Sequence, residues 1–160
     1  MKTRAVVSIL ILVLAVMIIS SCATTPKTQE EREGINPEIF FQSVKAGDYA
    51  EVKRLIEAEA DVNAQDNNGF TVLMLASANG HIDVAQLLIE EGADVNAQDK
   101  IGATALIVAS RRGQTYIVKL LIEAGADVNA QTNDGGTALM FASQDGHTEV
   151  VKLLIHAGAK

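Results

Sequence analysis

Apolar residues along this chain recur in short clusters that return at a fixed interval. The segment 61–65 reads DVNAQ, and the same five letters return at 94–98 and at 127–131, a spacing of 33 residues each time. Between them stand an apolar run, VLMLA at 72–76, and a second run, VAQLLI at 84–89, separated by polar residues and glycine. A fixed period of this length predicts stacked helical units that share one continuous core.

Each unit predicts a turn, a short helix, a tight turn and a longer helix. Thr71 precedes the first apolar run, where its hydroxyl can cap the free amides of a helix. Gly80 is expected to end that helix in the left-handed conformation, and Gly92 to end the second helix. The first unit has Glu59 in place of Gly92. Because a non-glycine residue in a left-handed position costs about 1 kcal/mol, we expect a less regular turn there.

Period, turn chemistry and motifs together resemble the ankyrin repeat family over residues 37–159. The family signature Thr-Pro-Leu-His is represented by TVLM at 71–74, TALI at 104–107 and TALM at 137–140, so threonine and leucine are kept while proline and histidine are lost. We expect apolar packing to replace the hydrogen bonding that the family makes between neighbouring turns, and the side chains concerned are Met74, Ile107 and Met140.

The resemblance implies an all-α solenoid of helix-turn-helix units with hairpin-like turns, spanning residues 37–160. It is expected to contain a divergent capping repeat and three full repeats, at 37–60, 61–93, 94–126 and 127–159. The first unit has the polar outer face that a terminal repeat needs to stay soluble, carried by Lys45, Asp48, Glu51, Lys53, Arg54 and Glu57.

The last repeat differs from the first because its second helix, 150–155, resembles that of an internal unit, and the sequence contains no capping repeat after it. We expect this end either to fray or to pack against a partner, such as a second copy of the chain.

The resemblance also implies a concave binding surface made from the turn tips and the outer side of the short first helices. Transferred residue by residue, the candidate partner-binding positions are Asn67, Asn68, Phe70, Ala78, Asn79, Gln98, Lys100, Ile101, Ala103, Arg111, Arg112, Gln131, Asn133, Asp134, Gly136, Gln144 and Asp145. Phe70 and Ile101 are either exposed contact residues or pack within the turn layer. Arg111 and Arg112 either hold an acidic partner or complement the end of a helix, and we favour the second role for at least one.

No catalytic or metal-binding pattern in the sequence is convincing. His81 and His147 are equivalent, at a position where the family commonly has histidine for structural reasons, and Gln114 fills the third place. The segment 61–66 resembles a calcium loop, but Asp66 stands where such a loop needs glycine and no glutamate follows at its twelfth place. We therefore predict a non-enzymatic protein with no metal and no cofactor. The formal charge of −7 argues against nucleic acid, which needs a basic face.

The N-terminal segment 1–21 has the three parts of a secretory signal. Lys2 and Arg4 precede an apolar run, 5–19, which gives way to small serines. A transmembrane helix needs about 20 apolar residues, more than this run supplies, so we predict a cleaved signal peptide.

Residues 19–22, Ile-Ser-Ser-Cys, resemble the lipobox of bacterial lipoproteins, in which the signal is cut before the cysteine and the cysteine is acylated. The resemblance implies a lipid such as palmitate on Cys22; the alternatives are a free thiol and an intermolecular disulfide. Ala23 resembles the outer-membrane-directed pattern. The following polar residues, to position 36, cannot bury enough surface to fold, so 22–36 is predicted to be a lipidated tether.

These features together predict a lipid-anchored bacterial envelope protein whose repeats bind a partner protein, on the outer membrane and facing the periplasm or the surface. The membrane is expected to be contacted through the lipid on Cys22. The rival is an accessory, chaperone-like or immunity factor that modulates one specific envelope enzyme. The third alternative is that the protein is an enzyme with an unrecognised site.

Overall fold

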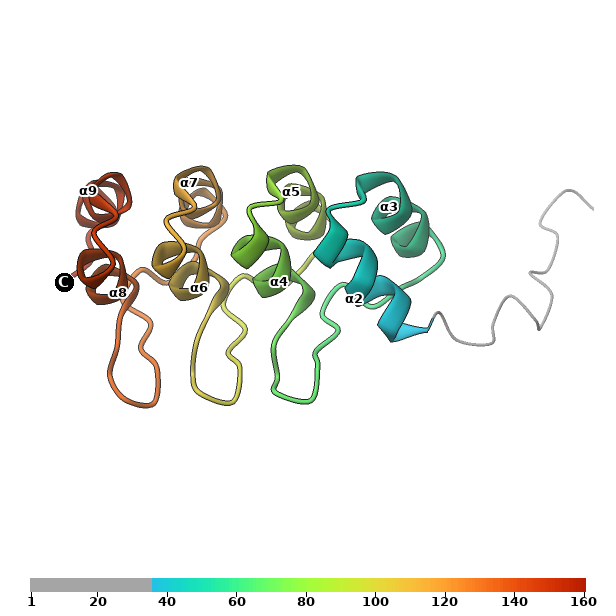
Figure 1. Ribbon diagram of the computed structural model, residues 1–160, viewed down its shortest axis with the longest axis horizontal. Helices are drawn as coiled ribbons and strands as arrows, with labels where there is room; N and C mark the ends of the chain where they lie inside the picture. Colours follow the sequence, from blue (N-terminus) through green and yellow to red (C-terminus); the bar gives the residue numbers. More distant parts are fainter. Residues whose placement is uncertain (1–35) are drawn as a thin grey trace, which may run out of the picture. The chain divides into compact units, whose positions relative to one another are not determined.

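The computed structural model describes residues 36–160, which form a row of helix pairs (Figure 1). The first helices of the pairs make one layer: α2 (Pro37–Ala46), α4 (Val72–Asn79), α6 (Ala105–Arg111) and α8 (Ala138–Gln144). The second helices make the other layer: α3 (Tyr49–Glu57), α5 (Ile82–Glu90), α7 (Thr115–Glu123) and α9 (Thr148–His156). The predicted all-α solenoid of ankyrin type is confirmed. The predicted signal peptide, Cys22 and all of the tether except Asn36 lie outside the described residues.

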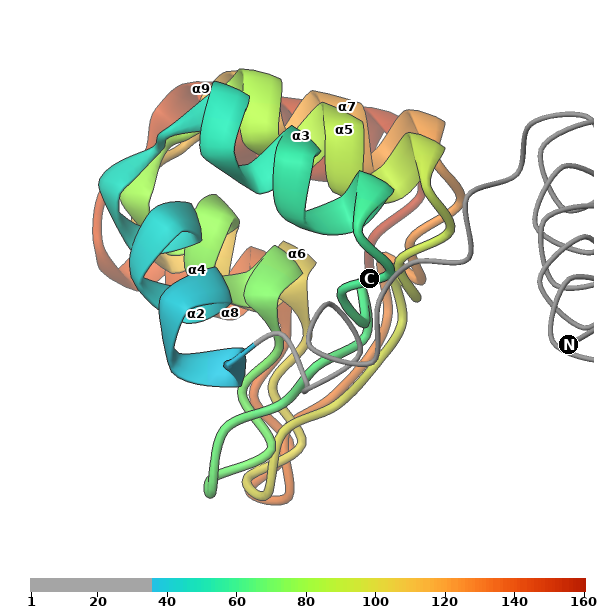
Figure 2. The ribbon, with the colours of Figure 1, turned by 90° about the vertical axis from the view of Figure 1, so that its right-hand side faces the viewer.

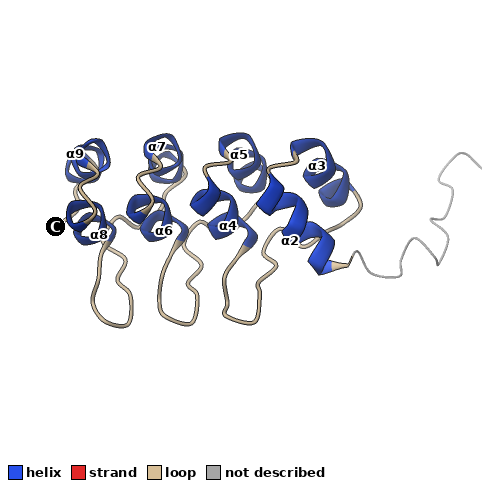
Figure 3. Ribbon diagram, in the orientation of Figure 1, coloured by secondary structure: helices blue, strands red, loops and turns tan. Residues whose placement is uncertain are grey.

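Long loops join successive pairs and project beyond the layer of first helices (Figures 2 and 3). We call them fingers, and they comprise residues 61–71, 94–104 and 127–137. Isolated bridges between Gln65 and Thr71, and between Gln131 and Thr137, hold the two arms of a finger together. The fingers are therefore the hairpin-like turns that the sequence predicts.

The first helices of the three full repeats begin after the threonines that the sequence predicts, and α4 ends at the predicted glycine. Thr71 Oγ1 accepts a hydrogen bond of 3.1 Å from the N–H of Met74, and Thr104 and Thr137 cap α6 and α8 in the same way. Gly80 follows α4 with φ +78°, the left-handed conformation that lets the chain reverse into the second helix.

The turn after α3 is more regular than expected. Glu59 has φ +75°, close to the +92° of Gly92, its equivalent one repeat later. The hydrogen bond that closes each turn is also the same, with 2.9 Å from Ala60 N–H to the Leu55 carbonyl and 2.9 Å from Ala93 N–H to the Leu88 carbonyl. The expectation of an irregular turn was wrong, because the same closing hydrogen bond holds Glu59 in the left-handed conformation despite its side chain.

A ladder of asparagine side chains links each repeat to the next. Asn63 Oδ1 accepts a hydrogen bond of 2.7 Å from the N–H of Asp94, and Asn96 Oδ1 accepts one of 2.8 Å from the N–H of Asp127. Asn129 accepts a third, of 3.0 Å, from the N–H of Lys160. The recurring asparagine of DVNAQ is thus a connector between repeats, a role that the sequence analysis did not assign.

The three side chains expected to pack between turns differ in how far they are exposed. Met74 and Ile107 are buried, with 0% and 3% of their surface exposed. Met140, the third member of the set, is 57% exposed. The expectation was therefore wrong for Met140, because no repeat in the described part of the chain lies beyond α8 to cover it.

Candidate functional site

The fingers are held rigid by side chains that bond to their own backbone. One carboxylate oxygen of Asp66 accepts hydrogen bonds from the N–H groups of Asn68, at 2.7 Å, and Phe70, at 2.9 Å. Asp99 makes the equivalent pair in the second finger. In the third finger the hydroxyl of Thr132 takes this place. Asp66, which the sequence analysis weighed as part of a calcium loop, is therefore used to shape the turn.

Neighbouring finger tips are also bonded to one another. Lys100 N–H donates to the Asn68 carbonyl at 2.9 Å, and Asn133 N–H donates to the Ile101 carbonyl at 2.9 Å. The amide of Asn133 adds a bond of 3.0 Å to the Lys100 carbonyl. Because the backbone groups at the tips pair with each other, the tips form one continuous ledge from which side chains project.

Most of the predicted partner-binding side chains are exposed on this ledge or on the first helices. The exposed set comprises Asn67, Asn68, Asn79, Gln98, Lys100, Ile101, Arg111, Arg112, Gln131, Asn133, Asp134, Gln144 and Asp145. Ile101 stands out because it is apolar and 62% exposed at the tip of a finger. An exposed apolar side chain on a rigid support is typical of a contact residue.

Four members of the predicted set are less available than expected. Phe70 is half-buried and packs against the core, so the structure supports its packing role over the contact role. Ala103 is buried, with 5% of its surface exposed, and Ala78 and Gly136 are half-buried. A methyl group on Gly136 would lie 2.7 Å from Cζ of Phe141 and 3.1 Å from the hydroxyl of Thr132, both in its own repeat.

The first helices contribute a row of apolar side chains that the sequence analysis missed. Leu75, Val108 and Phe141 are separated by 33 residues and are half-buried, packed against the core. The guanidinium of Arg111 lies over the ring of Phe141, with 5.6 Å from its Cζ to the ring centre. Such a contact favours a fixed side-chain position. Arg111 therefore has a packing role besides its place in the last turn of α6. The fixed spacing was the signal that could have revealed the row.

A groove of about 370 Å³ lies between α2 and the first finger. Phe41 and Leu75 provide apolar surface, and Glu38, Lys45 and Asp66 lie among its polar residues; the remaining lining residues are Pro37, Gln42, Gln65 and Asn67. The groove is continuous with the row of Leu75, Val108 and Phe141 because they share Leu75. The side formed by the fingers and the first helices thus offers apolar patches between polar rims, as protein-binding surfaces commonly do.

The two equivalent histidines connect neighbouring repeats. His81 Nε2 lies 2.9 Å from the Lys45 carbonyl and His147 Nε2 lies 3.0 Å from the Arg111 carbonyl, each reaching back one repeat. Since a carbonyl can only accept, Nε2 must carry the proton in both rings. These contacts agree with the structural role that the family resemblance implied for the two histidines.

Within residues 36–160, no three His, Cys, Asp or Glu side chains are grouped so that they could hold a metal ion. Over the same residues, every helix is too short or too polar to cross a membrane.

Comparison with known proteins agrees with this architecture. The profile described as "Ankyrin repeats (3 copies)" matches residues 12–99 and 93–160. Over 63 residues, which are 39% of this chain, the sequence is 44% identical to the mouse (Mus musculus) protein "Ankyrin repeat and SAM domain-containing protein 6". The matched region spans only 7% of that relative, so the likeness concerns the repeats. Ankyrin repeats generally mediate contacts between proteins and are typically non-catalytic. The chain belongs to the ankyrin repeat family.

Proposed function

We propose that this protein is a lipid-anchored scaffold of the bacterial cell envelope that binds a partner protein with its concave side. The observation that carries the proposal is the ledge of bonded finger tips, on which Ile101 is exposed beside polar and charged side chains. A rigid ledge lowers the entropy lost on binding, because the backbone of the fingers need not be ordered by the partner.

The partner surface combines apolar and charged chemistry. Lys100 and Arg112 are exposed on the same repeat as Ile101, and Asp134 and Asp145 are exposed on the next one. This arrangement suits a partner that offers an apolar anchor flanked by charges of both signs, with the charges setting orientation and encounter rate.

The anchor in this proposal is a diacylglyceryl group on Cys22, joined to the repeats by the tether 22–36. Two or more acyl chains bind a bilayer stably where one does not. Confinement to a membrane surface, which we propose is the outer membrane, raises the effective concentration of the scaffold for partners at that surface.

A photocrosslinking amino acid at position 101 tests the concave surface in intact cells. The expected result is one dominant crosslinked protein, identified by mass spectrometry. The matched control places the same amino acid at Tyr116, which is 75% exposed on α7 in the layer of second helices. Equal crosslinking at both positions would count against this surface. If the captured protein is an enzyme whose turnover changes on binding, the accessory role is the better description.

The anchor is tested by fractionation and mass measurement. We expect a mature chain that begins at Cys22 with added lipid mass and partitions into detergent. A Cys22→Ser variant should leave the membrane fraction; if it stays there, another feature of the chain anchors it. Separation of inner and outer membranes then tests the site of attachment.

We further propose that the outward side of the last repeat makes contacts of its own, including self-association.

A further inference from the structure

Positive charge on the side formed by the fingers and the first helices is concentrated in the repeat 94–126. Lys100 at a finger tip and Arg111 and Arg112 at the end of α6 are all exposed. At the equivalent places the two neighbouring repeats have neutral or acidic residues, namely Asn67, Ala78, Asn79, Asn133, Gln144 and Asp145. The charge is therefore an individual feature of this repeat and not a part of the repeated scaffold.

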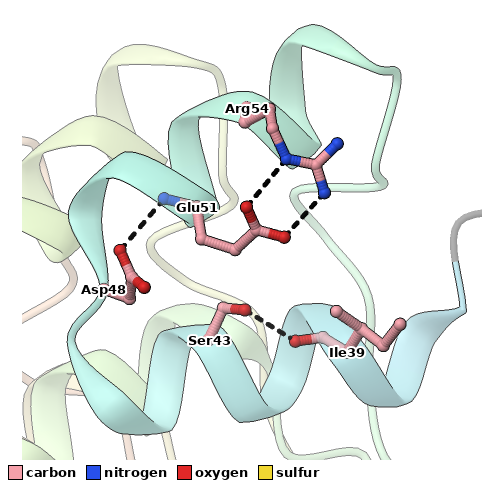
Figure 4. A network of polar contacts seen from close by, with 5 residues as sticks. All are labelled: Ile39, Ser43, Asp48, Glu51 and Arg54. Atoms are coloured by element: carbon pink, nitrogen blue, oxygen red, sulfur yellow. Dashed lines mark hydrogen bonds and ion pairs between the residues drawn. The ribbon is translucent and has the colours of Figure 1, made fainter.

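The three basic side chains have no ion pair within residues 36–160. Arg54 on α3 shows the contrast (Figure 4), because its guanidinium is held by Glu51 of the same helix, with 2.6 Å between Nη2 and Oε1. The other two ion pairs in this part of the chain also join side chains of a single second helix. The positive charges of Lys100, Arg111 and Arg112 are thus available to a carboxylate of another molecule.

Asp99, which precedes Lys100 in the chain, is committed to the shape of the finger. One of its carboxylate oxygens accepts hydrogen bonds from the N–H of Ile101, at 3.0 Å, and from the N–H of Ala103, at 2.8 Å. The residue is half-buried. Because these bonds orient the carboxylate towards its own turn, it supports the finger tip instead of pairing with Lys100.

Stabilisation of a helix end does not account for both arginines. A cation in the last turn of a helix offsets the partial negative charge of the free carbonyl groups, but the effect is modest. The neighbouring helices α4 and α8 have no basic residue in the last turn, and both form. The fold therefore does not need a pair of positive charges at the end of α6.

The two ends of the charged region are held in place before any partner arrives. At the finger tip, the N–H of Lys100 donates to the Asn68 carbonyl, and the Lys100 carbonyl accepts from the side-chain amide of Asn133. At the helix end, the guanidinium of Arg111 lies over the ring of Phe141. A ligand would consequently lose little entropy in ordering these groups.

Apolar side chains lie beside the charges. Ile101, next to Lys100, is 62% exposed. Val108 is half-buried, and it shares a face of α6 with Arg111 and Arg112 because these residues are three and four positions further along the helix. We call the five residues Lys100, Ile101, Val108, Arg111 and Arg112 the basic strip.

The distribution of charge indicates the direction in which a ligand lies. In the next repeat the finger tip and the helix end carry negative charge, at Asp134 and Asp145. A segment that runs along α6 therefore meets positive charge at both ends, whereas one that crosses from repeat to repeat meets both signs. The strip is at most about 25 Å long, because it consists of a few finger residues and a seven-residue helix. An extended peptide of about eight residues covers this length.

A short acidic segment suits the strip better than a large anionic surface. Residues 36–160 contain nine Lys and Arg but seventeen Asp and Glu. A nucleic acid or a membrane of anionic lipids would meet this net negative charge and be repelled. A segment that contacts only one repeat meets the local positive charge instead.

We propose that the basic strip binds an extended acidic segment of the partner protein. The segment lies along α6, with carboxylates at Lys100 and at the two arginines and an apolar side chain between them against Ile101 and Val108. The inference rests on the binding function proposed above for the same side of the molecule, and it names the chemistry of the partner. Paired hydrogen bonds from a guanidinium to a carboxylate give such a contact its orientation.

Synthetic peptides test the strip on the full-length chain in nonionic detergent. The probes are labelled peptides of about eight residues with blocked ends, leucine or phenylalanine at the centre and glutamates near both ends. The matched peptides have glutamine in place of each glutamate. We expect the acidic peptides to bind about tenfold more tightly, measured by fluorescence anisotropy, and the difference to shrink as salt is added.

Reversal of the charge on the strip should reverse the preference. With Lys100→Glu and Arg112→Glu together, peptides that have lysine in place of glutamate should bind about tenfold more tightly than the acidic peptides. Neither substitution threatens the fold, because Asn133 and Asp145 fill the equivalent places in the next repeat. Arg111 is left unchanged because it packs on Phe141.

The matched control reverses two basic residues of the other layer. Lys53 and Lys119 are exposed on α3 and α7. Lys53→Glu with Lys119→Glu makes the same change in net charge and should keep the wild-type preference for acidic peptides. Circular dichroism should show that both double variants unfold close to the wild-type temperature.

Several results would overturn the proposal. They are equal binding of the acidic and glutamine peptides, and a preference for acidic peptides that survives reversal of the strip. A third is strip-dependent binding of the Cys22→Ser chain to phosphatidylglycerol vesicles without binding to the peptides, which would identify a lipid headgroup as the ligand.

The photocrosslinker at position 101 separates this inference from the proposed function. A captured segment that is rich in acidic residues, and whose capture falls about tenfold on reversal of the strip, supports both. Capture of one protein through a segment without acidic residues, or capture that reversal does not change, contradicts the acidic segment and leaves the binding function standing. Equal crosslinking at positions 101 and 116 contradicts the binding function itself.

Discussion

The side-chain oxygen of Asn96 accepts a 2.8 Å hydrogen bond from the backbone N–H of Asp127, in the finger of the following repeat. Its side-chain nitrogen donates to the Gly125 carbonyl at 3.3 Å, so one amide satisfies a backbone group at the end of its own repeat and another at the start of the following repeat. The asparagine ladder thereby fixes the distance between successive fingers, on which the continuity of the ledge depends.

The ladder predicts that Asn96→Ala destabilises the stack by about 1–2 kcal/mol, because two backbone groups lose their partners. Urea unfolding of the full chain in detergent measures the change. Asn67→Ala, at an exposed finger tip, is the matched control and should change stability by less than about 0.5 kcal/mol. Equal effects of the two substitutions would show that the ladder adds little to stability.

The contact between Gly113 and His147 gives a second prediction. Gly113 has φ +68°, and a methyl group there would collide with a ring that is held by the Arg111 carbonyl. Gly113→Ala should therefore cost about 2–4 kcal/mol, from the collision and the left-handed conformation together.

Gly146→Ala is the control for this substitution, because Gly146 has φ +76° and an uncovered side. It should cost only the conformational part, about 1–2 kcal/mol. Thermal unfolding of both variants isolates the contribution of the collision. Gly113→Ala combined with His147→Ala should recover part of the loss; if it recovers none, the collision is relieved by other means.

Glu59 provides a third prediction, since it holds a left-handed conformation that its equivalents fill with glycine. Glu59→Gly should stabilise the protein by about 0.5–1 kcal/mol, the relief of strain being partly offset by the greater freedom of glycine when unfolded. Lys53→Gly, at an exposed position in the middle of α3, should instead destabilise by about 1 kcal/mol. Chemical unfolding of the two variants should give changes of opposite sign. A loss of stability in both would show that the backbone of Glu59 is not strained.

The sequence predicted the parts of this fold that depend on local chemistry. The 33-residue period, the threonine caps and the glycine turns follow from residues close together in the chain, and the structure has all three. The burial of Phe70 and the exposure of Met140 could not be predicted in the same way. Both depend on contacts between residues far apart in the chain, and equivalent residues such as Met74 and Met140 can differ in this respect even when they are identical.

The candidate site was predictable to the same degree. The exposed positions at the finger tips, such as Lys100 and Ile101, followed from the family resemblance. The row of Leu75, Val108 and Phe141 was not found, because each residue alone looks like part of a core helix. Its half-buried state depends on how the helices pack in three dimensions, which sequence spacing does not report.

The ion pair at the capped end predicts a dependence of stability on pH. The hydrogen bonds from Arg54 lower the pKa of the Glu51 carboxyl, and Glu51 in turn raises the pKa of Arg54. A carboxyl whose pKa is lower in the folded chain stabilises the fold above its unfolded pKa, about 4.3. The contribution is lost as the pH falls below that value towards the folded pKa.

Unfolding temperatures of wild type and Glu51→Gln, compared across this range, test the dependence. The wild type should be slightly more stable near neutral pH, and the difference should shrink towards zero in acid. The effect should be small because both side chains are exposed to water. Arg54→Gln should show the same reduced slope as Glu51→Gln; a difference that persists in acid would point to packing as its cause.

The buried hydroxyl of Ser110 gives the last prediction. Its Oγ is fully buried and has no hydrogen-bond partner within residues 36–160. A hydroxyl buried in this way costs about 1–3 kcal/mol relative to one that is satisfied. Ser110→Ala removes the unsatisfied group and should raise stability by about 1 kcal/mol. Ser143→Ala, at the equivalent but exposed position, should leave stability within about 0.5 kcal/mol of wild type. Chemical unfolding distinguishes the two, and a clear loss in Ser110→Ala would mean that the hydroxyl bonds to a buried water or to another part of the chain.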